Sequence, residues 1–117
     1  MKGAGARRLS FKRAFTAYYL ELYSPGIADP TAVFAACHEY LSALFADLGP
    51  QEFMRRLDEE VNELVGQLEQ DLRRILRARG ATDLNERFSA EVEERLRECI
   101  DYAIARLPLE AKRPSNT

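Results

Sequence analysis

The sequence predicts an all-α protein, an antiparallel helical bundle of about four helices built around one long central helix at about residues 50–79. Pro50 and Gly80 bracket an uninterrupted helical pattern. A proline at the first helical position and a glycine just past the last are the usual punctuation of a single helix. No stretch alternates apolar and polar residues as a β-strand does.

The central helix carries an apolar stripe whose members recur every three or four residues. From Phe53 to Ile75 the spacing averages about 3.67 residues, which fits a nearly straight bundle helix better than a supercoiled pair. The residues expected to pack against other helices or a second copy are Leu57, Val61, Leu64, Val65, Leu68, Leu72, Ile75 and Leu76.

The length of this central helix also predicts a homodimer. A helix over residues 50–79 is a rod of roughly 45 Å, which outreaches the helices expected beside it. Either the N-terminal arm or a second chain must therefore cover the apolar surface at its end, because burying such surface favours association.

Two shorter helices are expected before the central one. Ser10 is the expected N-cap of a helix over about residues 11–23. Asp29 and Pro30 predict the start of a second helix, which ends near Leu48.

A last helix is expected after a cap at Thr82 or Ser89 and ends near Leu107, just before Pro108. Taken together, the patterns predict a basic flexible arm at residues 1–9, a single helical-bundle domain at residues 10–108 and a flexible C-terminal tail at residues 109–117.

The N-terminal segment is basic, whereas the rest of the chain is acidic. The first 20 residues hold five basic residues and no acid, although the net charge of the chain is −2. Positive charge at the start of a helix opposes the helix dipole, so these cations suggest an external anionic surface. The expected partner-binding residues are Arg7, Arg8, Phe11, Lys12 and Arg13.

These patterns favour a small non-catalytic regulatory or adaptor protein that binds a protein partner of unknown identity and works as a homodimer. The basic segment leaves nucleic acid as an alternative partner, since contacts from Lys and Arg to phosphates supply much of the affinity in such complexes. We expect no cofactor, no metal and no membrane span, and a cytoplasmic location.

Cys37 and Cys99 fall inside apolar helical patterns and are expected to be reduced thiols in the core. His38 is the single histidine of the chain and follows Cys37 directly. Neighbouring residues on a helix point about 100° apart, so this pair does not form a metal site by itself.

Four carboxylates support a second alternative. Glu60-x-x-Glu63 lies on the central helix and Glu98-x-x-Asp101 on the last one, and each pair faces one side of its helix. Carboxylate oxygens are ligands that suit Mg²⁺. The pattern resembles the MazG-like family of all-α nucleoside-triphosphate pyrophosphohydrolases, although the gap of 34 residues between the pairs is longer than usual. The resemblance covers these four positions and implies that they would bind Mg²⁺ in a nucleotide hydrolase.

Overall fold

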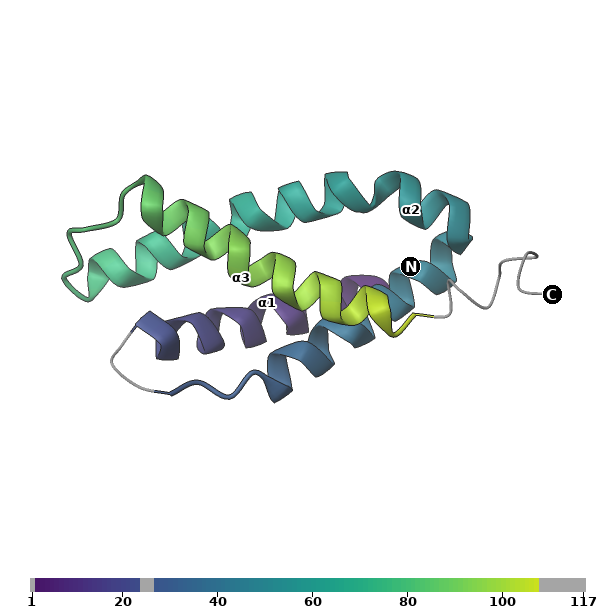
Figure 1. The fold of residues 1–117 in the computed structure, drawn as a ribbon, viewed down its shortest axis with the longest axis horizontal. Coiled ribbons are helices and arrows are strands. Elements are labelled where there is room, and N and C mark those ends of the chain that lie inside the picture. Colours follow the sequence, from purple (N-terminus) through teal and green to yellow (C-terminus); the bar gives the residue numbers. More distant parts are fainter. Residues whose placement is uncertain (1, 24–26, 108–117) are drawn as a thin grey trace.

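The computed structural model describes residues 2–23 and 27–107 of the 117-residue chain. This part of the chain is all-helical and has no strand, as the sequence predicted. Its elements are α1 (Lys2–Tyr23), α2 (Thr31–Ala78) and α3 (Glu86–Ala105) (Figure 1). The predicted C-terminal tail at residues 109–117 lies outside the described residues.

Helix α2 is broken at Gly49. The backbone there has φ 81° and ψ 166°, a conformation that is open to glycine and strained for other residues. Pro50 follows it, and a proline disfavours the helical conformation in the residue before it. The two arms of α2, residues 31–48 and 50–78, therefore run back along each other (Figure 1).

The predicted bundle of four helices around a separate central helix is not confirmed. The described part of the chain has three helices, because the second predicted helix and the central one are joined within α2. The predicted boundary at Gly49 and Pro50 nevertheless coincides with the break in α2, because the backbone of Gly49 is not helical.

Helix α1 begins at Lys2, so the prediction that residues 1–9 form a flexible arm is wrong for residues 2–9. Contacts with α2 explain the extension. Ala4 is buried, and Arg7 and Arg8 form ion pairs with carboxylates of α2. These contacts outweigh the glycines near the N-terminus and the capping tendency of Ser10.

The apolar stripe of the central segment packs inside this chain. Its buried members are Leu57, Val61, Leu64, Leu68, Leu72 and Leu76, whereas Val65 and Ile75 are half-buried. Its members therefore pack within one chain, and of the two expected covers, the N-terminal segment is the one that contacts the second arm of α2. Helix α1 begins at Lys2, and Arg8 in its N-terminal turns pairs with Glu60 and Glu63 of α2.

Aromatic side chains of α1 anchor it in the core. Phe11 stacks on Tyr40 of α2 with ring centroids 6.2 Å apart, and Tyr19 meets the ring edge of Phe88 in α3 at 5.8 Å. Phe15 lies between them along α1 and is fully buried. These three aromatic side chains therefore connect α1 to both other helices.

The C-terminus of α2 forms a Schellman motif. The N–H of Ala81 donates to the carbonyl oxygen of Leu76 at 2.9 Å, and the N–H of Gly80 donates to that of Arg77 at 3.0 Å. Gly80 has φ 95°, as this motif requires. The next helix, α3, is capped by Asn85, which was not among the predicted caps.

Arg73 closes the connection between α2 and α3. Its guanidinium donates to Glu69 at 2.9 Å, to the carbonyl oxygen of Leu84 at 2.7 Å and to the hydroxyl of Ser89 at 2.7 Å. Ser89 in turn donates to Glu69. This hydrogen bond from Ser89, followed by the charge and hydrogen bond of Arg73, lowers the pKa of Glu69 below its ordinary value.

We expect this network to make the protein sensitive to acid. A carboxylate whose pKa is lowered by folding stabilises the native state at neutral pH, and the effect is lost as the pH falls from 4.5 through the folded pKa. Glu69→Gln should therefore flatten the acid limb of the unfolding free energy measured by urea titration. Asp58→Asn is the matched control, since Asp58 is exposed and has no partner among the described residues. Equal acid limbs in the two variants would contradict the assignment.

Two glycine substitutions should have opposite effects on stability. An alanine at position 49 meets no atom within 4 Å, so Gly49→Ala should lower the unfolding free energy through backbone strain alone, by about 1–3 kcal/mol. Gly66 lies in an exposed helical turn, and an alanine there also meets no atom within 4 Å. Gly66→Ala should raise the unfolding free energy by about 1 kcal/mol, because alanine favours a helix more than glycine does. Chemical denaturation measures both changes. A Gly49→Ala variant as stable as the wild type would contradict the assignment of backbone strain to the break at Gly49.

Candidate functional site

Three of the five predicted partner-binding residues are engaged inside the chain. Arg7 pairs with Glu39 at 2.9 Å. Arg8 lies 3.4 Å from Glu63 and also pairs with Glu60. Phe11 has no exposed surface, so the expectation that it faces a partner is wrong. The sequence did not reveal these contacts, because the paired carboxylates lie far along the chain.

Lys12 and Arg13 keep uncompensated positive charge. Lys12 donates to the neutral amide oxygen of Gln67 at 2.8 Å. Arg13 is exposed and has no hydrogen bond or ion pair within residues 2–23 and 27–107. These two residues are therefore the part of the predicted site that remains available.

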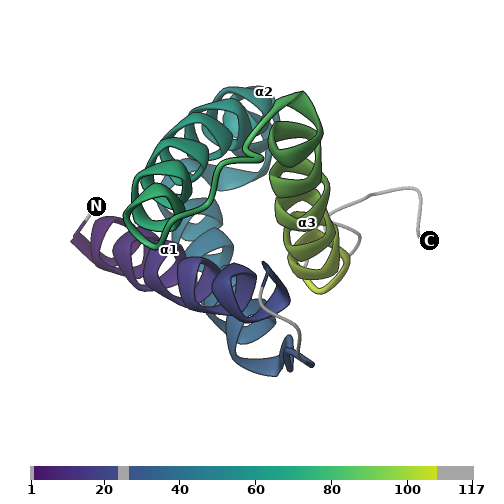
Figure 2. The same ribbon diagram turned by 90° about the vertical axis from the view of Figure 1, so that its left-hand side faces the viewer.

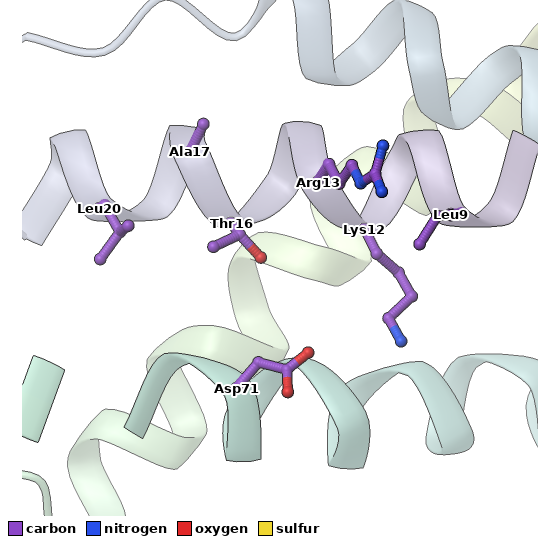
Figure 3. A pocket seen from close by; sticks show the side chains of 7 residues that line it. All are labelled: Leu9, Lys12, Arg13, Thr16, Ala17, Leu20 and Asp71. Atoms are coloured by element: carbon purple, nitrogen blue, oxygen red, sulfur yellow. The ribbon is translucent and has the colours of Figure 1, made fainter. Parts of the chain in front are cut away.

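A shallow groove of about 350 Å³ lies beside these cations, between α1 and the second arm of α2. Figure 3 shows side chains from both helices along it, with the carboxylate of Asp71 opposite Thr16 and Lys12. Its lining residues are Leu9, Lys12, Arg13, Thr16, Ala17, Leu20 and Asp71. Apolar side chains and unpaired cations thus share one surface.

The α1 side of this groove belongs to a second helical face. Its members recur at steps of 3, 4, 3, 4 and 3 residues, and we call it the outer face of α1: Ala6, Leu9, Arg13, Thr16, Leu20 and Tyr23. All six are exposed or half-buried, and Leu9 keeps 48% of its surface exposed. This spacing is typical of a face that packs against another helix.

Sequence reasoning missed the outer face because it placed the start of the helix at about residue 11. Ala6 and Leu9 then fell in an arm without regular structure, and the remaining positions were too few to show a repeat. The spacing of these residues already contains the repeat, which becomes evident once the helix starts at Lys2.

The four carboxylates of the hydrolase alternative do not form a metal site. Glu60 accepts a hydrogen bond from Tyr40 at 2.6 Å and faces Arg8, whereas Glu98 pairs with Arg95 on its own helix. Among the described residues, no three His, Cys, Asp or Glu side chains gather where they could hold an ion. The structure therefore does not bring together Glu60, Glu63, Glu98 and Asp101, the ligand set of the hydrolase alternative.

Both cysteines are free thiols in the core. Burial raises the pKa of Cys99 to about 12 and also raises that of Cys37. Neither thiol has the lowered pKa of a reactive cysteine. His38 lies at the surface of α2, where its Nε2 is 3.4 Å from the hydroxyl of Ser42.

Comparison of the chain with protein-family models, with curated proteins and with solved structures finds no match. None of the helices in the described ranges has a stretch long and apolar enough to cross a membrane.

The ion pairs of Arg8 should contribute to stability. Its side chain is about one quarter exposed and contacts Glu60, Glu63 and Gln67. Arg8→Ala should therefore lower the unfolding free energy by about 1 kcal/mol, measured by chemical denaturation.

Arg87 provides the control, because its side chain is exposed and has no partner among the described residues. Arg87→Ala should change the unfolding free energy by less than about 0.5 kcal/mol. Equal effects of the two substitutions would mean that the Arg8 pairs contribute nothing.

Proposed function

We propose that this protein is a small non-catalytic regulatory or adaptor protein that acts by protein–protein interaction through the outer face of α1. One observation supports this proposal most directly. Helix α1, whose inner face is packed in the core, carries a second, regularly spaced face whose side chains stay exposed or half-buried in its own chain. Regular exposed faces of this kind are typical of helix–helix recognition.

The rest of the fold serves as the scaffold in this proposal. Helix α1, the two arms of α2 and helix α3 act as an antiparallel bundle around residues 50–79, which holds the outer face rigid. Figure 2 shows α1 at the edge of this arrangement. A cytoplasmic location belongs to the same proposal, since free buried thiols are usual in a reducing compartment.

A protein partner is favoured over nucleic acid. Binding to a phosphate backbone relies on several cations that are free to contact it. Here Arg7 and Arg8 already pair with carboxylates, and the remaining cations lie beside Leu9 and Leu20. Apolar groups between a few charges are the usual composition of a protein-binding surface.

Capture experiments with matched variants test the proposal. A tagged wild-type protein should retain one protein at stoichiometric yield from a nuclease-treated extract, and Leu9→Glu should reduce that yield more than about tenfold by placing a charge in the contact. Met54→Glu is the control, because Met54 is 52% exposed and Leu9 is 48% exposed, yet Met54 lies on α2.

Two outcomes would contradict this assignment. Equal capture by the Leu9 and Met54 variants would exclude the outer face as the contact surface. Capture that is lost on nuclease treatment would favour the nucleic-acid alternative.

A further inference from the structure

We infer that the partner at the outer face of α1 is a second copy of this chain, whose own α1 lies antiparallel to the first. This inference rests on the proposed function, which makes that face the contact surface. It adds the identity of the occupant, the direction of pairing and the residues that meet.

The outer face of α1 is complementary to the same face of a second copy that runs in the opposite direction. With Arg13 of one copy opposite Thr16 of the other, Leu9 lies opposite Leu20, and Ala6 lies opposite Tyr23. Each of these pairs occurs twice about a two-fold axis, which is the geometry of the commonest homodimers. Apolar side chains thus meet apolar ones, and every position of the face has a partner.

The spacing of the face suits such a pair of helices. Its positions average about 3.4 residues per step, close to the repeat of about 3.5 that brings two helices together along a seam. Thr16 and Ala17 are small, so that a second helix can approach closely beside the groove.

Charge determines the direction of pairing. The five basic residues of α1 all lie between Lys2 and Arg13, and residues 14–23 contain Glu21 as their single charged residue. A parallel pair would set Arg13 against Arg13 of the second copy. An antiparallel pair instead places the basic half of each helix against the half without cations.

The antiparallel register also provides Arg13 with a carboxylate. Asp71 lies across the groove from Thr16 (Figure 3), so an Arg13 that packs on Thr16 from the second copy comes next to Asp71. Within its own chain, Asp71 accepts both hydrogen bonds from Arg74 through Oδ1, at 3.3 Å, and its Oδ2 has no partner among the described residues. The unpaired cation and the open carboxylate oxygen complement each other.

The mass of the purified protein in solution is the first test. We expect light scattering to give twice the 13.3 kDa of one chain. Leu9→Glu should halve that mass at the same protein concentration, whereas Met54→Glu should leave it unchanged, with the helical circular dichroism of both variants retained.

A monomeric wild-type protein would overturn the inference. If that monomer still captured a different protein in a Leu9-dependent way, the proposed function would stand without the inference. A dimer that is unaffected by Leu9→Glu would also overturn it.

Engineered cysteines test the register. In the antiparallel pair of the double variant Leu9→Cys/Leu20→Cys, the thiol at position 9 of one chain lies opposite the thiol at position 20 of the other. Oxidation should therefore link the two chains, and a non-reducing gel would show the linked product. Within one chain the two positions lie about 16 Å apart along the helix, too far for a disulfide. The native Cys37 and Cys99 are buried and do not compete.

The two single variants are the controls. Leu9→Cys alone and Leu20→Cys alone should give little linked product, because like positions are far apart in an antiparallel pair. Efficient linkage of the single variants would indicate a parallel pair, and failure of the double variant to link would indicate a different contact surface. Either result would overturn the inference.

Discussion

The backbone constraint at Gly49 and Pro50 determines the shape of this molecule. A proline cannot donate the hydrogen bond that a continuing helix needs, and the glycine before it adopts a conformation that strains other residues. The chain of α2 therefore turns back on itself instead of extending as one rod. The two arms that result present apolar faces, on which α1 and α3 are packed.

Polar groups at the margins of this core are satisfied in a consistent way. Tyr40 donates to Glu60 and Tyr19 donates to Glu91, so each aromatic ring is buried while its hydroxyl reaches a carboxylate at the edge. No buried side-chain nitrogen or oxygen of the described residues lacks a hydrogen-bond partner. Such satisfaction favours a single arrangement of the helices, because any shift would leave buried polar groups unpaired.

The helical class and the packing stripe of the central segment could be predicted from the sequence, because both follow from apolar residues that recur every three or four positions. The N-terminus of α1 could not. Gly3 and Gly5 weaken helix propensity, and the contacts that outweigh them involve Glu39 and Glu60, which are distant along the chain. The same distant carboxylates pair with Arg7 and Arg8, which leaves Lys12 and Arg13 as the cations of the predicted binding site that have no ion pair among the described residues.

The order of the helices has a consequence for how quickly the protein folds. Helices α1 and α3 both pack mainly on α2, so neighbours in sequence are also neighbours in space. Most contacts in the described part of the chain are local, so the entropy lost before they form is small, although the pairs of Arg8 with Glu63 and of Tyr19 with Glu91 close longer loops. Such a topology belongs to the rapidly folding proteins, in which little time is spent with apolar faces open to aggregation.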